Sequence, residues 1–525
     1  MKGYETMKNT LKSKMFVGLF IALALALTPV LSTATTAAVP SHLSNPTAFY
    51  AKLAQWPGAN VDWYLADPDA AEFSISTPAE LFGMAFLVNT EIELTPNGGF
   101  VQTVTFEGKT VKLTADIDLS TVNSDYTSST ATYGELWAPM GWGAWDESSI
   151  PNSPGEAAFW GTFDGNGFTV SGLANKSLFG MVKSATIKNL LTSGTLTTTG
   201  TGSSRIAGVA NEAKNSTFIN LKSDAHLVFS AISTLPVGGI VSAVVGNTTI
   251  DNCEFSGTFT TTTNQQSLGG IVGQVGVGVN GGAYFTTTNL TVSNSVNRAD
   301  LSSRFNIGGI VGATEYTYTA NLAIPSISIV IQDSVNYGNI SASLDNAGDR
   351  YGVGGLVGAS YYSNAGTPQS LTIENSANYG NVTGGINTGG LVGTVYQGNQ
   401  LNITNSYNQG NVTSTRVGGG IVGRIVNADG AVIKNTYDTG TVSGANSGGF
   451  AGIISAGAVD SVNNYYLDTA APGAVNSAPY TGVTALTAAQ MKDPSFASML
   501  GDGYVMGEDG YPILAWQSIE PVDKT

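Results

Sequence analysis

The chain has 525 residues, a formal net charge of −16 and only 11% charged residues. This acidic balance disfavours nucleic acid as a partner, because binding to phosphates needs an excess of Lys and Arg. A single cysteine, Cys253, excludes a disulfide framework within one chain. With only His42 and His226 beside it, the sequence offers no set of ligands for a thiolate- or histidine-based metal centre and no catalytic triad. We therefore expect no metal site and no cofactor.

The first 37 residues have the pattern of a secretory signal peptide. Lys8, Lys12 and Lys14 precede an apolar run over residues 15–27, and small residues follow up to Ala37. This order of segments predicts export and cleavage near residue 37 or 38. A membrane anchor is the alternative, but the run is about a dozen residues and a spanning helix needs about 20. We expect a mature chain with no membrane span and no visible covalent anchor.

A helix is predicted after a Trp- and Tyr-rich segment that has no clear periodicity. Thr77 and Glu80 form a capping-box pattern, and Pro78 occupies the first helical position. The apolar residues of one helical face follow at Leu81, Met84, Ala85 and Val88. We expect this amphipathic helix to cover the open end of the repeats that come next.

A repeated phrase, Gly-Gly-Ile/Leu-Val-Gly, organises most of the remaining chain. Some copies are complete and others are degenerate. Their second glycines are Gly208, Gly239, Gly270, Gly309, Gly355, Gly390, Gly420 and Gly449. Successive copies are 29 to 46 residues apart, a spacing that indicates stacked repeats. About 30 residues accommodate three short strands and three turns. We predict an all-β fold, a parallel β-solenoid (β-helix) of roughly ten coils with short helical caps at both ends. A β-propeller is the alternative, but its blades need about 40–50 residues and four strands each.

A second phrase, rich in Asn and Ser, follows each glycine phrase at a variable distance. One register of this phrase holds Asn189, Asn220, Asn252, Asn294, Asn375, Asn405, Asn435 and Asn464, with Asp333 substituting once. In a parallel stack these side chains would form an amide ladder that also satisfies turn backbone groups. The next position holds a row of small side chains: Cys253, Ser295, Ser334, Ser376 and Ser406. Cys253 is therefore interpreted as part of that row rather than as a nucleophile, and His226 as a solvated turn residue.

The end of the chain changes character again. Thr487 and Gln490 form a second capping box, and residues 510–516 have the pattern of a last strand that ends on Trp516. We expect this part to cap the other end of the stack.

The two phrases together resemble the GLUG-motif repeats of secreted and surface-exposed prokaryotic proteins. The resemblance extends to residues 62–64, 73–77, 113–119 and 161–167 and to the ending at 510–516, so it covers roughly residues 60–518. It implies a β-solenoid on an exported protein, often in adhesion-like contexts, and it brings no general catalytic motif. Some relatives carry a zinc peptidase module, but this chain contains no His-Glu-x-x-His motif.

These patterns divide the chain into five parts. They are a signal peptide (1–37), a Trp/Tyr-rich segment with a capping helix (38–99), N-terminal solenoid coils (100–205), the GLUG-type repeat solenoid (206–470) and a C-terminal cap (471–525).

Parallel β-helices also host polysaccharide lyases and hydrolases, so an enzyme is the alternative function. Such a site needs carboxylates, or carboxylates with Arg or Lys, that converge on one face. The candidate carboxylates are Asp116, Asp118, Asp164, Asp251, Asp333 and Asp438, and they are dispersed among coils or typical of turns. We expect no catalytic residues. The sequence does not decide whether the protein binds calcium, since the turns are acidic but no contiguous oxygen-ligand loop occurs.

The better candidates for function are aromatic residues in the segments that follow the glycine phrases. These residues are Tyr284, Phe285, Tyr316, Tyr318, Tyr361, Tyr362 and Tyr396. Insertions at one position of a repeat project from one side of a solenoid, and exposed rings suit sugars or a protein partner. We expect a non-enzymatic extracellular binding, adhesion or structural protein whose partners are glycans or surface proteins of host or neighbouring cells. The alternative is that these rings fold back and cover the apolar core.

Overall fold

A computed structural model of the chain describes fourteen segments of it. They are residues 46–90, 104–121, 139–141, 157–198, 205–229, 236–261, 267–276, 287–314, 326–343, 351–360, 369–396, 399–426, 430–457 and 459–518. The chain divides into one unit of Met1–Tyr50 with Glu93–Gly99 and a second of Ala51–Ile92 with Phe100–Thr525. Only residues 46–50 of the first unit, the start of helix α2 (Pro46–Leu53), are described, so the predicted signal peptide lies outside the described residues.

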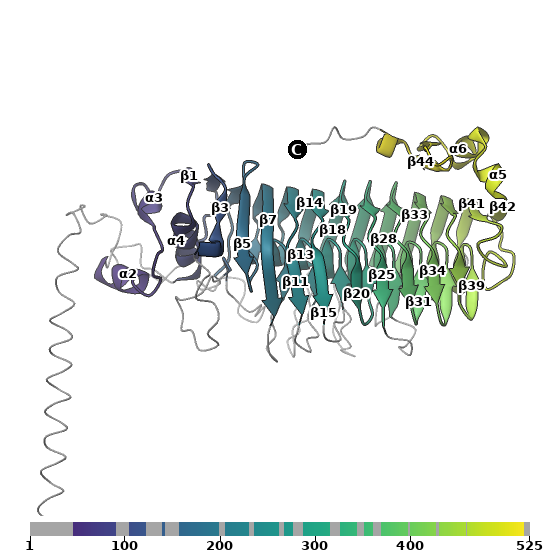
Figure 1. Ribbon diagram of the computed structural model, residues 1–525, viewed down its shortest axis with the longest axis horizontal. Coiled ribbons are helices and arrows are strands. Elements are labelled where there is room, and N and C mark those ends of the chain that lie inside the picture. Colours follow the sequence, from purple (N-terminus) through teal and green to yellow (C-terminus); the bar gives the residue numbers. More distant parts are fainter. Residues whose placement is uncertain are drawn as a thin grey trace, which may run out of the picture. The chain divides into compact units, whose positions relative to one another are not determined.

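The second unit is built from parallel strands that repeat along the chain (Figure 1). One coil shows the pattern: β22 (Val311–Thr314), β23 (Ile327–Gln332), β24 (Val335–Asn336), β25 (Ile340–Ala342) and β26 (Gly352–Gly354). Each strand pairs in parallel with its counterpart in the following coil; β23, for example, pairs with β28 over six consecutive residues. The predicted parallel β-solenoid is therefore confirmed, and a propeller is excluded because these sheets run from coil to coil.

Corresponding strands form four parallel sheets. The valine sheet contains β6 (Phe179–Lys183), β9 (Ala210–Lys214), β13 (Val241–Val245), β17 (Val272–Val275), β22, β27 (Val357–Ser360), β32 (Val392–Val395), β36 (Val422–Ile425) and β40 (Ala451–Ile454). The glycine sheet contains β8 (Ile206–Ala207), β12 (Val237–Gly238), β16 (Leu268–Gly269), β21 (Ile307–Gly308), β26, β31 (Asn387–Gly389), β35 (Val417–Gly419) and β39 (Asn446–Gly448). The short sheet contains β20 (Leu301–Ser303), β25, β30 (Val382–Gly384), β34 (Val412–Ser414) and β38 (Val442–Ser443).

The long sheet joins twenty strands. Its N-terminal members are β1 (Glu72–Ile75), β2 (Thr110–Leu113), β3 (Ile117–Asp118), β4 (Thr162–Asp164), β5 (Thr169–Ala174), β7 (Thr186–Thr198), β10 (Thr217–Ser223), β11 (His226–Phe229), β14 (Asn247–Phe255) and β15 (Thr258–Thr261). The others are β18 (Thr288–Ser293), β19 (Val296–Asn297), β23, β24, β28 (Gln369–Glu374), β29 (Ala377–Asn378), β33 (Asn399–Asn408), β37 (Val432–Asp438), β41 (Asp460–Leu467) and β42 (Val483–Leu486).

The glycine phrase forms the corner between the glycine sheet and the valine sheet. At this corner the N–H of Gly309 donates to the carbonyl of Gly355 in the next coil at 3.1 Å, so pairing between coils continues around the bend. A Cβ atom on Gly309 would overlap that carbonyl and the Asn336 side chain, and one on Gly312 would overlap the backbone of Gly273. Only glycine allows backbones to approach this closely.

Helices cover the start of the stack. α3 (Asp62–Leu65) precedes β1, and α4 (Pro78–Asn89) follows it with the predicted capping box, in which Glu80 N donates to Thr77 Oγ1 at 3.2 Å. Every residue of α4 from Leu81 to Val88 is buried, so the helix is apolar around its whole circumference rather than amphipathic. One cause is the loop before α3, whose Asn60 backbone packs directly against Gly83. A short 3-10 helix, η2 (Leu119–Thr121), follows β3.

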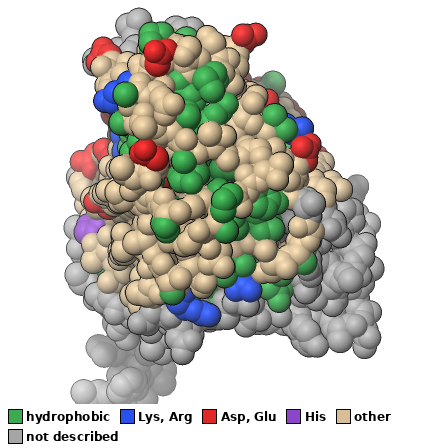
Figure 2. Space-filling model, turned by 90° about the vertical axis from the view of Figure 1, so that its right-hand side faces the viewer, with side chains coloured by type: hydrophobic (Ala, Val, Ile, Leu, Met, Phe, Trp, Pro, Cys, Tyr) green, Lys and Arg blue, Asp and Glu red, His purple; other side chains and the backbone are tan. Residues whose placement is uncertain are grey.

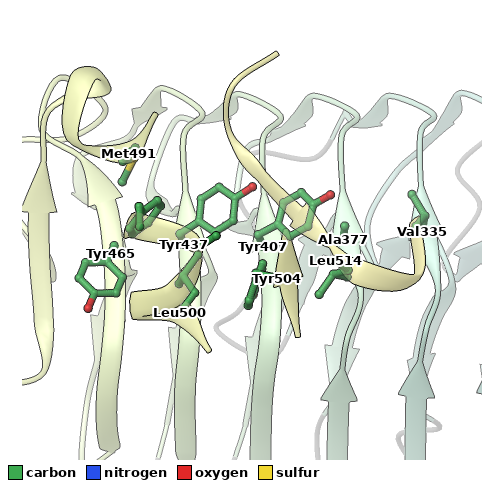
Figure 3. Packing of buried hydrophobic residues seen from close by; sticks show 11 residues of the cluster. Val335, Ala377, Tyr407, Tyr437, Tyr465, Met491, Leu500, Tyr504 and Leu514 are labelled. Carbon is green, nitrogen blue, oxygen red and sulfur yellow. The ribbon is translucent and has the colours of Figure 1, made fainter. Parts of the chain in front are cut away.

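The C-terminal part divides into two structures. Residues 469–486 cover the last coil, where Phe450 N donates to Ala474 O at 3.0 Å and β42 pairs with β41. Residues 487–518, which we call the strap, turn back and lie along the long sheet (Figures 1 and 3). The strap contains α5 (Ala488–Met491), α6 (Pro494–Leu500), β43 (Tyr504–Met506), β44 (Pro512–Leu514) and η4 (Ala515–Ser518).

The strap is held by a row of side chains on the outer side of the long sheet. The row consists of Val335, Ala377, Tyr407, Tyr437 and Tyr465, which pack against strap residues including Phe496, Leu500, Tyr504 and Leu514 (Figure 3). Tyr504 Oη donates to the carbonyl of Asn435 at 2.8 Å, and Trp516 Nε1 donates to that of Asn375 at 3.0 Å. The sequence predicted a cap over the end of the stack, whereas the strap clamps several coils from the side.

Replacing a corner glycine should destabilise the fold much more than replacing a loop glycine. Gly355→Ala places a methyl group into the carbonyl of Gly390, and we expect it to lower the free energy of unfolding by about 3 kcal/mol. Gly430→Ala is the matched control, because its Cβ meets no atom within 4 Å and only the φ of +82° opposes it. That strain should cost about 1–2 kcal/mol. Denaturant unfolding measures both, and equal losses would contradict the proposed role of the corner.

Candidate functional site

Of the seven aromatic residues predicted to bind ligand, the structure describes Tyr396. Tyr284, Phe285, Tyr316, Tyr318, Tyr361 and Tyr362 lie outside the described residues. Tyr396 follows β32, is half-buried, and donates its backbone N–H to Ser360 O at 2.9 Å. Its ring packs against Ala313 and Ala359 of the valine sheet. At this position the ring folds back onto the stack, as in the alternative interpretation.

The segments that carry these aromatic residues are anchored at one corner of the stack. Each begins at the end of a valine-sheet strand and ends at the start of a long-sheet strand, as between β22 and β23 or between β27 and β28. Because β22 and β27 are paired neighbours, and so are β23 and β28, the anchors of successive segments lie side by side. A second connection of variable length joins the short sheet to the glycine sheet, as between β25 and β26. The two kinds of insertion are not distinguished by the sequence pattern alone.

The predicted amide ladder forms an outer amide row at a bend in the long sheet. Its members adopt the left-handed conformation, with φ between 47° and 55°, which Asn tolerates better than other side chains. Nδ2 of Asn220 donates to Asn189 at 2.9 Å, and Nδ2 of Asn252 donates to Asn220 at 2.7 Å. Nδ2 of Asn294 instead donates to Asp251, so the row is interrupted there. Several members are exposed, so backbone conformation rather than burial explains the residue type.

The later members of the outer amide row require one correction. Nδ2 of Asn435 donates to Asn405 at 3.1 Å, and Nδ2 of Asn463 donates to Asn435 at 3.2 Å. Asn463, with φ of 54°, is therefore the last member, and the assignment of Asn464 was wrong by one residue. Asn464 pairs with Thr436 in the neighbouring row and is buried. Adjacent asparagines made the register ambiguous in the sequence.

A second, buried amide row was missed. It consists of Asn297, Asn336, Asn378, Asn408 and Asp438. Each Nδ2 donates at 2.7 Å to the next member and also to the carbonyl two residues further on, as Asn378 does to Asn408 and Gly380. The signal was present in the sequence as Asn-x-Gly three residues after Asp333, Asn375 and Asn405, with Asn-Arg-Ala after Asn294 and Asp-Thr-Gly after Asn435. The row ends at Asp438, whose Oδ2 is buried without a hydrogen-bond partner.

The predicted row of small side chains links coils through their backbones. Oγ of Ser295 accepts from Cys253 N at 3.2 Å, and Oγ of Ser334 accepts from Ser295 N at the same distance. Ser376 and Ser406 continue the pattern. Cys253 itself is 1% exposed, and burial raises the pKa of its thiol to about 12. A thiol that stays protonated and inaccessible is a poor nucleophile.

The N-terminal candidate carboxylates hold structural positions. Asp164 accepts from Nδ2 of Asn189 at 2.9 Å and pairs with Lys188 at 3.2 Å. Asp116 accepts from the N–H of Thr169, and Asp118 caps the N–H of Ser120. The hydrogen bonds from Ser120 hold the pKa of Asp118 below its usual range. These contacts explain the aspartates as turn and strand-end residues.

The remaining candidates are also engaged with neighbouring coils. Asp251 accepts from Ser293 and Asn294, each at 2.7 Å. Burial raises the pKa of Asp333, and a hydrogen bond from Asn375 opposes that shift. His226 lies beside Thr195 and Thr258 in the long sheet, with Nε2 2.8 Å from Thr260 Oγ1. Within the described segments, no three acidic, His or Cys side chains are grouped so that they could hold a metal ion.

A stack of Arg298, Tyr337 and Tyr379 was not predicted; Arg298 and Tyr337 are exposed, and Tyr379 is half-buried beside the strap. The three occupy one row of successive coils, since each follows a member of the buried amide row. The Tyr337 and Tyr379 rings are parallel within 13° at 5.1 Å, and the Arg298 guanidinium lies 5.1 Å from the other side of Tyr337. Tyr337 is 43% exposed, but both faces of its ring are covered. This stack therefore offers ring edges and a hydroxyl group, not a ring face for a sugar.

Comparison with known proteins gives a distant structural resemblance and no family. No family model matches the chain, and no curated protein matches it. A crystal structure described as a "putative immunoglobulin A1 protease" from Bacteroides ovatus is similar at 17% identity and a TM-score of 0.35, over 85% of this chain and 93% of that one. The chain is a β-solenoid-like parallel-sheet protein that distantly resembles this structure. In the part of the chain that the structure describes, no helix has the length and hydrophobicity for a membrane crossing.

Cys253 should be replaceable by serine but not by a residue without a hydrogen-bonding group. Its Sγ contacts Asp251 O at 3.4 Å, the place where serine hydroxyls donate in the following coils. We expect Cys253→Ser to change stability by less than about 1 kcal/mol and Cys253→Val to cost about 1–3 kcal/mol. In the native protein the thiol should not react with an alkylating reagent, as mass spectrometry would show. Rapid modification without unfolding would contradict the structural assignment.

Asp438→Asn should stabilise the protein, and increasingly so at higher pH. Burial raises the pKa of Asp438 well above its usual range. The folded state therefore retains a proton that the unfolded chain releases above about pH 4, so stability falls as pH rises from there. An Asn side chain removes this loss, and its Nδ2 can donate to the carbonyl two residues on, as in the preceding coils.

Unfolding of the Asp438→Asn variant should be followed by denaturant titration between pH 4 and 8. We expect a gain of roughly 1–3 kcal/mol near pH 7 that shrinks toward pH 4. The exposed Asp468 supplies the control, since Asp468→Asn should give no comparable gain. A pH-independent difference between Asp438→Asn and the parent would show that ionisation of Asp438 is not the cause.

Proposed function

We propose that the protein is an exported, non-enzymatic β-solenoid that serves as an extracellular binding, adhesion or structural surface protein. The observation that supports this best is the common corner from which the aromatic-rich segments leave successive coils. A rigid stack with segments of unequal length at one corner suits the display of a contact surface. The signal-peptide pattern and the resemblance to GLUG-motif repeats agree with export.

The stack has the rigidity that such a display needs. Backbone pairing continues around the glycine corner, two amide rows and one hydroxyl row connect successive coils, and the strap clamps the later coils from outside. Surface segments on such a scaffold can vary in sequence without disturbing the core. We therefore assign structural roles to the repeated positions and contact roles to the variable segments.

Glycans or surface proteins of host or neighbouring cells are the proposed partners. Aromatic side chains bind both, because a ring can pack against the apolar face of a sugar and a tyrosine can also donate a hydrogen bond. The net charge of −16 disfavours polyanions such as nucleic acid. Tyr396 contributes packing rather than contact in this proposal, because its ring lies against the valine sheet.

A carbohydrate-active β-helix enzyme is the competing function. Its prediction is turnover of a polysaccharide by convergent carboxylates. Each candidate carboxylate in the described segments has a structural partner or is buried, which favours the non-enzymatic proposal. Incubation with acidic and neutral polysaccharides, followed by assay for new reducing ends or unsaturated products, tests it. Release of either product would support the enzyme and overturn the proposal.

Binding should depend on the tyrosines of the variable segments. The variant carries Tyr316→Ser, Tyr318→Ser, Tyr361→Ser and Tyr362→Ser together. We expect it to bind whole cells or a glycan array at least about tenfold more weakly, because about 1.4 kcal/mol of contact energy is enough for that change. Tyr337→Ser is the matched control, since it removes an exposed tyrosine from another side of the stack. Unchanged binding by a folded quadruple variant would refute the proposed contact surface.

A further inference from the structure

The end of the stack has an unusual charge distribution. No Asp, Glu, Lys or Arg occurs between Asp468 and Lys492, in a chain whose net charge is −16. Residues 469–486 within that interval cover the last coil, and we call them the terminal face. Figure 2 looks onto this end and shows hydrophobic and uncharged side chains in its middle, with charged side chains toward the rim. Depletion of charge at the centre and a polar rim are features of protein interfaces.

The terminal face is exposed although it is uncharged. Residues 476–479 are exposed, as are Thr484 and Ala485 of β42, while Val483 and Leu486 are half-buried. Val462 of the adjacent β41 is 43% exposed and is one of the few large hydrophobic side chains of the described segments with so much open surface. The face thus combines apolar surface with unprotected polypeptide backbone.

The backbone of β42 has an open edge. β42 pairs in parallel with β41 on one side, and no described strand pairs with its other side. Gly482 O accepts from Asn464 N of β41, and Leu486 O accepts from Asp468 N, one residue after β41. Backbone groups in a parallel ladder alternate in direction, so Val483 and Ala485 direct theirs away from β41. The N–H of Val483 is already engaged there, because it donates to Tyr480 O at 3.2 Å, so the open N–H of this edge is that of Ala485. Natural proteins usually protect such an edge with charge, proline, a bulge or a covering element, and β42 itself contains neither a charged residue nor proline.

The start of the stack is different. There α4 is buried over its whole apolar length, and it lies beside β1 and β3 in Figure 1. β1, the first strand of the long sheet, pairs with β2 and with no other described strand, but it carries Glu72, which forms an ion pair with Lys112 at 2.7 Å. A head-to-tail contact would therefore bring the uncharged terminal face against an edge with charged side chains. A contact between two terminal faces brings together two open edges of the same sequence.

We propose that the terminal face binds the terminal face of a second copy of this chain, with the two β42 strands antiparallel about a twofold axis. The twofold arrangement is self-complementary and closes after two copies. It satisfies the open backbone groups of both strands by adding each strand to the sheet of its partner. It also joins two strongly acidic chains where each carries no formal charge, so desolvation and repulsion oppose the contact least.

Sedimentation velocity of the chain without its predicted signal peptide tests this proposal across micromolar concentrations. We expect a monomer–dimer equilibrium and no larger species. Ala485→Pro should weaken dimerisation about tenfold or more, because proline has no backbone N–H to donate across the interface. In a twofold dimer the substitution removes this hydrogen bond from both copies. Val483→Glu should also dissociate the dimer, because it places two new carboxylates against each other.

Thr372→Glu is the matched control. Thr372 is half-exposed like Val483 and lies in the same long sheet, several coils away from the terminal face. It should leave the dimer unchanged, and the unfolding midpoints of all variants should establish that they are folded. A monomeric parent chain, species that grow beyond dimers, or a dimer that survives both terminal-face substitutions would each overturn the proposal. Equal dissociation by Thr372→Glu would do so as well, since it would indicate general charge repulsion.

Discussion

The structure depends on direct backbone contact between successive coils. At the corner formed by the glycine phrase, the N–H of Gly309 reaches the carbonyl of Gly355, and neither residue leaves room for a Cβ atom. Parallel pairing then continues through the bend, and the same register is passed to every sheet of the coil. A bulkier residue at this corner would separate the coils locally and break the register on both sides.

Shared register is also the reason that side chains form rows. Any residue that recurs once per coil meets its own counterpart in the next coil, so one favourable contact is repeated along the stack. The buried amide row uses both hydrogen atoms of each amide, one within its coil and one to the next. Cys253 and Asp438 show what happens at single exceptions: a thiol substitutes for a hydroxyl, and a carboxyl leaves an oxygen without a partner.

Period and composition predicted the coil and its parallel sheets, because glycine spacing and alternation are local properties of the chain. Contacts between distant segments could not be predicted in the same way. Tyr407 and Tyr437 lie on the outer side of the long sheet, the side that would face solvent in a bare stack. They are buried because the strap, about 75 to 110 residues later in the chain, packs against them. The outer amide row was predicted by residue identity, but its left-handed backbone and the choice of Asn463 over Asn464 depend on the register of β41.

The rows that repeat most regularly are therefore the least informative about function. They are explained by contacts between coils, as the packing of Arg298 and Tyr379 against Tyr337 shows even for an exposed ring. The parts of the chain that the repeat does not explain are the variable segments, whose ends meet the corner between the valine and long sheets, and the uncharged terminal face. Among the described strands, β1 and β42 each end the long sheet with an unpaired edge, but β1 carries the charged Glu72 and β42 carries no charge. That difference between the two ends of one stack favours contact between two terminal faces, as proposed above, over a head-to-tail contact.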